Sequence, residues 1–227
     1  MFIVRFRTHI FVSLYTKVVG SSTICVATLE SAHGQLSYSN IGDGGLLLAR
    51  RFQSNTAGYM HNAQAEVKIA YLSQQQLRSF NLPFQLGFTN IAGTPCDFEA
   101  PTDADTASIS VTPGDVIVLA TDGLFDNVDM QEIVREIAKW QKDFFNNSPE
   151  LLRQSAQRGA PKGAETALAE RLVRLARELS LDKNRDSPFA LLAKENDILW
   201  GGGMPDDTTV LVGRIVSVPA RHKTIGY

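Results

Sequence analysis

Carboxylate side chains stand at the ends of two apolar, strand-like segments of this 227-residue chain. In the first, V-I-V-L-A at residues 116–120 leads into T-D-G-L-F-D, which carries Asp122 and Asp126. In the second, M-P-D-D-T-T at residues 204–209 carries Asp206 and Asp207 and leads into V-L-V. A strand end holds a side chain rigidly at the rim of a core, and hard divalent cations prefer oxygen ligands. These residues could form a metal site, an acid–base pair or a structural network.

The neighbouring residues favour a metal. Neither motif contains Lys or Arg, so converging carboxylates would repel one another and raise each other's pKa unless a cation were bound. Neither contains His or Cys, and an all-oxygen site suits Mg²⁺ or Mn²⁺ better than zinc. Only one of Asp206 and Asp207 is expected to point at Asp122, because adjacent residues face opposite ways. Asp side chains that bond to their own backbone in D-G and P-D turns remain an alternative.

Composition excludes several other classes of protein. Apolar residues make up 44% and charged residues 20% of the chain, as in soluble globular proteins, and the formal net charge of -2 gives no sign of a nucleic-acid partner. No run of residues is long and apolar enough to span a membrane. Cys25 and Cys96 are the two cysteines, which argues against a disulfide scaffold or a structural zinc site. Cys25 is expected to be a small buried apolar residue rather than a reactive thiol.

The pattern of residues predicts the elements that position the motifs. We expect a three-stranded meander over residues 23–29, 35–41 and 46–52, then mostly loop with short strands over residues 53–101. A hairpin is expected over residues 106–111 and 116–121. Apolar spacing predicts helices over residues 129–145 and 164–180 and a short helix over residues 188–199.

A final strand is expected over residues 208–216, beside the strand that ends at Asp122. This pairing would bring Asp122 and Asp206 together. Strands followed by helices and a last strand argue for an α+β fold. In the helix at residues 164–180, Leu168, Leu172, Leu175 and Leu179 are expected to form the buried face.

Four segments together resemble the type-2C (PPM-type) metal-dependent Ser/Thr protein phosphatases. They are G-S-S-T at residues 20–23, S-N-I-G-D-G-G at residues 39–45, T-D-G-L-F-D, and P-D-D-T-T-V at residues 205–210. They stand in the family's order from about residue 19 to residue 216. N-L-P-F-Q-L at residues 81–86 and D-S-P-F-A at residues 186–190 resemble the family's organelle-associated branch.

The resemblance implies a four-layer α-β-β-α sandwich of two antiparallel sheets flanked by helices, with two Mg²⁺ or Mn²⁺ ions at one edge. Such enzymes hydrolyse phosphoserine and phosphothreonine in phosphoproteins with a metal-activated water and form no phospho-enzyme, so no side chain is a catalytic nucleophile. By motif, Asp122 and Asp206 would ligate the metals, and Asp43 and Asp126 would match an additional, weaker site. Asp207 and Thr208 would support these ligands.

The chain departs from the family at its start. It has no D-G-x-G-G segment, which in the family supplies a bridging aspartate, so the domain is expected to be N-terminally truncated. Asp43-Gly44-Gly45 lies in a later turn and does not replace it. Arg5 and Arg7 are candidates by composition for gripping substrate phosphate. The alternatives are therefore an active phosphatase, a catalytically impaired isoform or pseudophosphatase that binds partners, and a cation-binding domain of another family.

Residues 1–18 are expected to form an atypical, leader-like segment, residues 19–217 the phosphatase-like domain and residues 218–227 a tail. Residues 1–29 contain no acid, which is typical of organelle transit peptides; an ordinary strand or helix and an unnatural start site are alternatives. Mitochondrion, plastid and cytoplasm all remain open. His33 and His61 are expected on the surface or in turns, and Gly201-Gly202-Gly203 as a flexible approach to the second motif.

Overall fold

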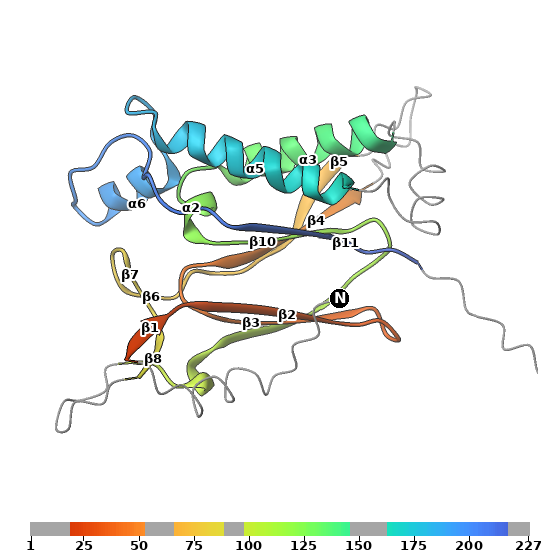
Figure 1. Ribbon diagram of the computed structural model, residues 1–227, viewed down its shortest axis with the longest axis horizontal. Coiled ribbons are helices and arrows are strands. Elements are labelled where there is room, and N and C mark those ends of the chain that lie inside the picture. Colours follow the sequence, from red (N-terminus) through yellow and green to blue (C-terminus); the bar gives the residue numbers. More distant parts are fainter. Residues whose placement is uncertain (1–18, 53–65, 89–97, 146–162, 218–227) are drawn as a thin grey trace, which may run out of the picture.

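Two antiparallel β-sheets stack face to face, and helices cover one of them (Figure 1). The computed structural model describes residues 19–52, 66–88, 98–145 and 163–217. The leader-like segment and the tail lie outside this range, so those domain boundaries stay predictions. Within it, the α+β fold with antiparallel sheets and helices is confirmed. The described α-helices all lie on the side of the four-stranded sheet, so three of the four expected layers are seen.

The four-stranded sheet has the order β11-β10-β4-β5, and the three-stranded sheet the order β2-β3-β9. Two short pairs, β1 with β8 and β6 with β7, extend from one end. The strands are β1 (Gly20–Ser22), β2 (Ile24–Glu30), β3 (Gln35–Ile41), β4 (Gly45–Phe52), β5 (Glu66–Leu72), β6 (Leu77–Ser79), β7 (Leu82–Pro83), β8 (Leu86–Phe88), β9 (Asp105–Ser110), β10 (Val116–Ala120) and β11 (Val210–Arg214).

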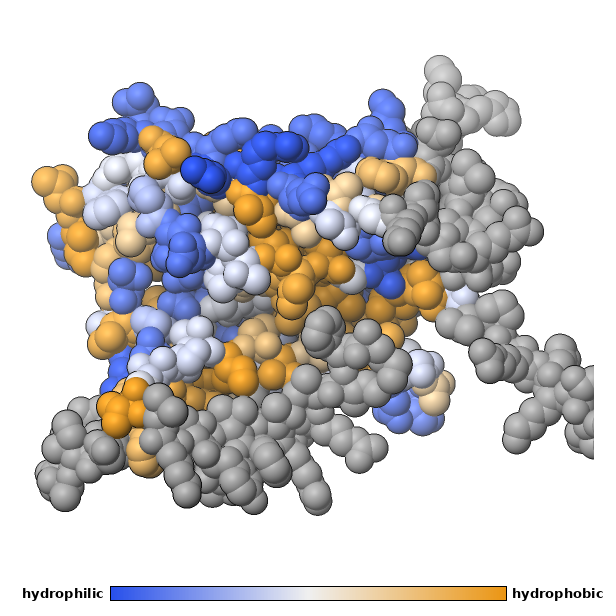
Figure 2. All heavy atoms as spheres, in the orientation of Figure 1, coloured by the Kyte–Doolittle hydropathy of each residue, from blue (hydrophilic) through white to orange (hydrophobic). Residues whose placement is uncertain are grey.

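The helices are the 3₁₀ helix η1 (Pro101–Asp103) and the α-helices α2 (Asp122–Phe125), α3 (Met130–Phe145), α5 (Ala164–Ser180) and α6 (Pro188–Glu195). Three helices follow the predicted segments, and the short helices η1 and α2 were not predicted. Leu168 and Leu172 of α5 are fully buried, while Leu175 and Leu179 pack at the edge of the same core. Figure 2 shows hydrophilic side chains over the outer surface of α3 and α5. Among the described residues, no helix is both long and apolar enough to cross a membrane.

Strand β4 lies between two hydrophobic cores. Leu47 packs with the helices, whereas Leu46 and Leu48 pack between the sheets, and all three are fully buried. The predicted three-stranded meander is therefore wrong at its third strand: β3 pairs with β2 and β9, and β4 pairs with β10 and β5. A strand that is apolar on both faces has to lie in the middle of a layered fold, where each face is covered.

The predicted hairpin over residues 106–121 is also wrong, because β9 and β10 belong to different sheets. Asp115 sits in the connection between them with 1% of its surface exposed. Its carboxylate accepts two hydrogen bonds from Arg50 of β4, at 2.9 and 2.7 Å, and one from the Thr112 N–H at 2.8 Å. This ion pair ties the connection to the four-stranded sheet and stabilises a crossover instead of a tight turn.

Residues 53–101 contain more regular structure than predicted. The short strands β6, β7 and β8 agree with the expectation, but β5 is a full strand paired along β4. Its sequence E-V-K-I-A-Y-L does alternate, with Val67 buried and Glu66 and Lys68 exposed. This alternation is typical of an edge strand with one solvated face.

Candidate metal centre

The first aspartate motif forms a sharp turn from strand to helix. Asp122 begins α2 one residue after β10 ends, and Asp126 caps the end of that helix, where its N–H donates to the Asp122 carbonyl at 2.8 Å. The Asp122 Oδ1 atom accepts a hydrogen bond from the Gly123 N–H at 2.8 Å. Likewise, Asp206 Oδ1 accepts from the Asp207 N–H at 2.6 Å. Both aspartates therefore cap their own turns through Oδ1, which leaves Oδ2 of each for another ligand.

The second motif lies beside the first because β11 pairs with β10, as the sequence predicts. The Thr121 N–H donates to the Thr209 carbonyl at 3.1 Å, and the Thr209 N–H donates to Thr121 Oγ1 at 3.0 Å. The contact continues at Gly123, where an added Cβ would lie 2.6 Å from the Asp207 carbonyl oxygen. Only glycine permits this approach of the two turns.

Asn127 joins the two motifs, and the sequence analysis did not single it out. It is 1% exposed. Its side-chain amide donates to the Gly123 carbonyl at 3.0 Å and to the Met204 carbonyl at 2.8 Å, and it accepts from the Met204 N–H at 2.8 Å. A polar side chain directly after T-D-G-L-F-D, in the turn before α3, was the available signal. Its partner at Met204 could not be read from the chain because it lies 77 residues away.

Asp43 reaches the same edge from the turn between β3 and β4. It is 7% exposed. The neighbouring Gly44 packs on the end of β10, since a Cβ there would lie 3.2 Å from the Ala120 carbonyl oxygen. Gly42 permits this turn with a φ of +117°, and a Cβ on it would lie 2.4 Å from the Thr23 side chain. Three separate turns thus place their aspartates at one edge of the four-stranded sheet.

The four aspartates act on one another electrostatically. Burial, followed by the charges of Asp122 and Asp206, raises the pKa of Asp43 to about 6. Burial and the charges of Asp122, Asp43 and Asp206 raise the pKa of Asp126 to about 7, against the opposing effect of a hydrogen bond from Gln75. The pKa of Asp122 is also raised, by burial and by Asp206. Asp206, and not Asp207, is the residue of this pair whose charge acts on the other three.

No positive charge offsets this cluster in the part of the chain that the structure describes. None of the ion pairs formed there includes Asp43, Asp122, Asp126 or Asp206. Within the same residues, no three His, Cys, Asp or Glu side chains approach closely enough to hold one ion in this structure. The oxygen donors and their unbalanced charge fit a hard divalent cation, and the assignment of individual ligands stays a prediction.

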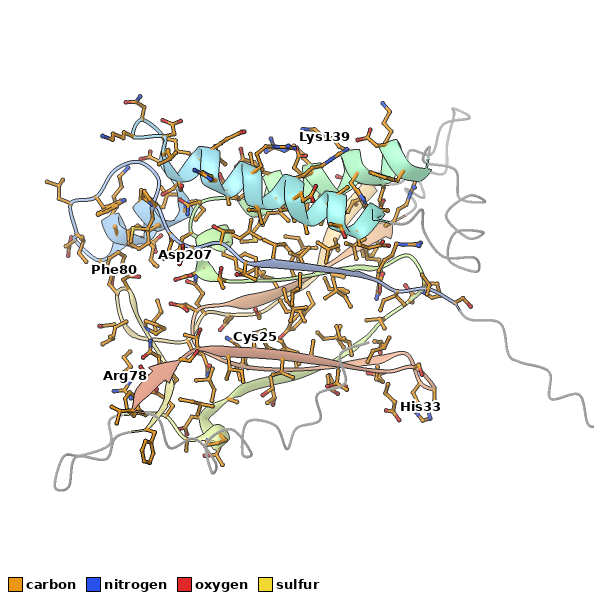
Figure 3. The ribbon with its side chains drawn as sticks, viewed as in Figure 1. Cys25, His33, Arg78, Phe80, Lys139 and Asp207 are labelled. Atoms are coloured by element: carbon orange, nitrogen blue, oxygen red, sulfur yellow. The ribbon has the colours of Figure 1, made fainter. Side chains whose placement is uncertain are left out.

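Asp207 and Thr208 lie at the contact between the turns. Asp207 is exposed, and its carbonyl accepts from Thr121 Oγ1 at 3.2 Å. Thr208 Oγ1 would lie 2.8 Å from a Cβ at Gly123. Figure 3 shows Asp207 at one end of the sandwich and His33 at the opposite end. The supporting role predicted for Asp207 and Thr208 stays a prediction.

The remaining residues considered in the sequence behave mostly as expected. His33 is an exposed turn residue beside Glu30, with 3.0 Å between Nδ1 and Oε1. Cys25 is partly buried and packs against the core between the sheets, and burial raises the pKa of its thiol to about 12, which disfavours the reactive thiolate. His61, Cys96, Arg5 and Arg7 lie outside the described residues.

The glycine run does not form the flexible approach that was predicted. Gly202 and Gly203 are buried, and their N–H groups donate to the Arg185 and Asp182 carbonyls at 3.1 and 2.8 Å. A Cβ at Gly203 would lie 2.3 Å from the Leu179 carbonyl oxygen. The run is glycine because it packs directly on the end of α5.

Asp126 is expected to make the metal-free protein less stable as the pH rises. Its unfolded pKa lies near 3.9 and its folded pKa at about 7, so the native state binds more protons between these values. Stability therefore falls across this range. The Asp126→Asn variant should lose this part of the pH dependence and be more stable than the unsubstituted chain at pH 8, by about 2 kcal/mol. Urea denaturation in EDTA at pH 5 and pH 8 measures it.

Asp143→Asn is the matched control, since Asp143 lies half-exposed on α3 beside Arg171. It should leave the pH dependence unchanged. An Asp126→Asn protein whose stability falls between pH 5 and pH 8 as steeply as that of the unsubstituted chain would contradict the prediction.

No protein-family model matches the chain, but individual relatives do. It is 34% identical over 201 residues to "Protein phosphatase PTC7 homolog fig" of Drosophila mojavensis, covering 88% of this chain and 54% of that protein. It is 34% identical over 197 residues to the human "Protein phosphatase PTC7 homolog", covering 86% of this chain and 54% of that protein. A solved structure, "X-ray structure of the photosystem II phosphatase PBCP", is 29% identical with a TM-score of 0.62, covering 89% of this chain and 67% of that one.

This chain belongs to the type-2C (PPM-type) protein phosphatase family. The chain spans about half the length of the curated relatives it matches. The type-2C D-G-x-G-G motif does not occur within residues 1–227.

Proposed function

We propose that this chain acts as a metal-dependent phosphatase on phosphoserine and phosphothreonine residues of proteins. The observation that carries the proposal is the set of Asp43, Asp122, Asp126 and Asp206, whose charges act on one another at one sheet edge and which form no ion pair within the described residues. Membership of the type-2C family supports the same activity. The elements behind the cluster are rigid, because β4 and β10 are central, buried strands.

Asp122 and Asp206 would hold the principal metal, and Asp43 and Asp126 an additional ion. A bound Mg²⁺ or Mn²⁺ ion would lower the pKa of a coordinated water and stabilise negative charge on phosphoryl oxygens. The protein's own part is to hold the carboxylates in place. Asn127 fixes the two motifs relative to each other, and burial of Asp43 and Asp126 keeps their negative charge poorly solvated, which favours cation binding.

Phosphate release from a phosphothreonine peptide tests the proposal. The purified 227-residue chain should release phosphate when Mn²⁺ or Mg²⁺ is added and stop when EDTA is added, and the Asp206→Asn variant should release at least about 100-fold less. The Asp143→Asn variant should match the unsubstituted chain. No release with either cation would overturn the proposal for this chain. If the phosphopeptide still bound, that result would favour the non-catalytic binding module.

A further inference from the structure

A cavity opens beside the aspartate cluster, with a volume of ≈ 200 Å³. Asp43 and Asp126 line one side of it, together with Ser73 and Gln75 from the segment after β5. Gln75 donates to Asp126 Oδ1 at 3.2 Å, and Ser73 Oγ accepts from the Leu46 N–H at 2.8 Å. The cavity is therefore continuous with the candidate metal centre, and its polar side is already held by hydrogen bonds.

The remaining walls are apolar and come from four parts of the chain. Leu72 ends β5, Phe125 ends α2, Met130 begins α3, and Pro188 and Leu192 belong to α6. Phe125 is buried, whereas Leu72 is 39% exposed at the mouth. Apolar side chains that face an open cavity are a common feature of binding sites for uncharged groups.

Helix α6 is fastened to the aspartate cluster, so this wall keeps its position. The Phe189 N–H donates to the Asp126 carbonyl at 3.0 Å. Ser187 is fully buried, caps the helix by accepting from the Ala190 N–H at 3.0 Å, and donates to the Gly202 carbonyl at 2.7 Å. The Phe189 ring contacts Phe80 and Trp200, with centroids 5.1 and 5.4 Å away. Figure 3 shows Phe80 at the same end of the molecule as Asp207.

The charges around the cavity determine what it can hold. The described residues that line the cavity include two carboxylates and no Lys or Arg. A phosphate group would therefore be repelled there unless metal ions intervened. Its size suits a hydrocarbon group, because a cavity of about 150 Å³ lined by apolar side chains can hold a benzene ring. An uncharged aliphatic or aromatic side chain therefore fits best.

We propose that this cavity receives an apolar side chain of the substrate polypeptide, one or two residues from the phosphorylated residue. The proposal rests on the proposed function, since the phosphorylated residue has to lie at the neighbouring aspartate cluster. The cavity would then select phosphoproteins with Leu, Met or Phe close to the phosphorylation site, while the metals bind the phosphate.

Peptide binding to the complete 227-residue chain in Mn²⁺ tests this selection without requiring turnover. The probes are fluorescein-labelled nine-residue alanine peptides that carry an uncleavable phosphonate analogue of phosphothreonine. Leu, Gly, Asp or Lys is placed at each of the two positions on either side. Fluorescence anisotropy should give a Kd about tenfold lower for Leu than for Gly at one of these positions. Equal affinities at every position, or a preference for Lys, would overturn the proposal.

Two variants of α6 show where the selection arises. Leu192→Trp fills the cavity and should abolish the preference for Leu, while the affinity for the Gly peptide stays unchanged. Leu191→Trp is the matched control, because Leu191 is the adjacent residue, is 45% exposed and does not line the cavity. Loss of the preference in both variants, or in neither, would place the recognition elsewhere. Leu192→Ala, which should weaken the preference about threefold, replaces Leu192→Trp if that protein does not fold.

Hydrolysis of a phosphothreonine peptide whose flanking residues are all glycine separates this proposal from the proposed function. That substrate has no side chain for the cavity, so its Mn²⁺-dependent turnover by the unsubstituted chain and by the Leu191→Trp control reports on the metal centre. A chain without turnover that still prefers Leu peptides keeps the cavity assignment and loses the catalytic one. A chain with turnover but without any peptide preference keeps the catalytic assignment and loses the cavity assignment.

Discussion

Replacing Asp122 by Asn is expected to weaken Mn²⁺ binding by about 100-fold or more. The amide keeps the shape of the side chain and can still accept the hydrogen bond from the Gly123 N–H, so the turn should persist. It carries no negative charge, however, and charge is what attracts a divalent cation to this edge. Isothermal titration calorimetry with MnCl₂ on both proteins measures the change.

Two further variants locate the other ligands. Asp206→Asn should cause a loss of similar size, because the Asp206 charge acts on Asp43, Asp122 and Asp126. Asp207→Asn should cause a much smaller loss, since Asp207 contributes its backbone carbonyl to the contact between the turns. Unchanged Mn²⁺ affinity in Asp122→Asn would remove Asp122 from the proposed ligands. A large loss in the distant Asp143→Asn control would mean that the titration reports non-specific binding.

The Asp115→Ala substitution is expected to lower the free energy of unfolding by about 3 kcal/mol. The Asp115 side chain is 1% exposed and the Arg50 side chain 27%. Removing the carboxylate leaves the guanidinium with its hydrogen bond to the Ser110 carbonyl but without its acidic partner, and leaves the Thr112 N–H without its acceptor. Urea denaturation followed by circular dichroism measures the loss.

The matched control is Glu66→Ala, which breaks an exposed ion pair on β5. Its partners, Lys68 and Glu66, are 57% and 68% exposed, and such pairs contribute less than about 1 kcal/mol. Asp115→Asn should fall between the two, because an amide oxygen can still accept from Thr112. A loss below about 1 kcal/mol in Asp115→Ala would show that the crossover does not depend on this pair.

Local sequence patterns were sufficient for the helices α3, α5 and α6 and for most of the strands. The leucines of α5 recur with helical spacing, and the helix spans residues 164–180 as predicted. The expected pairing of the last strand with β10 is also confirmed. The helices and strands themselves depend on neighbours within a few residues, and such information is contained in a short window of sequence. The pairing of β10 with β11 instead joins segments that lie far apart in the chain.

The allocation of strands to sheets needed the whole fold. The patterns at residues 35–52 and 106–121 looked like hairpins, and both connections instead cross between the sheets. What decides between these arrangements is the coverage of both faces of β4 and the buried pairing of Arg50 with Asp115. Those partners lie 65 residues apart, so no local pattern reports them.

The same division holds for the candidate metal centre. The sequence alone determined which carboxylates stand at strand ends without a neighbouring cation, because this follows from residue type and adjacency. Only the tertiary structure decided that Asn127 bonds to Met204 and that α6 lines a cavity beside Asp126. Each of these depends on segments that packing brings together, since the free energy of burying their shared surface exists only in the folded chain.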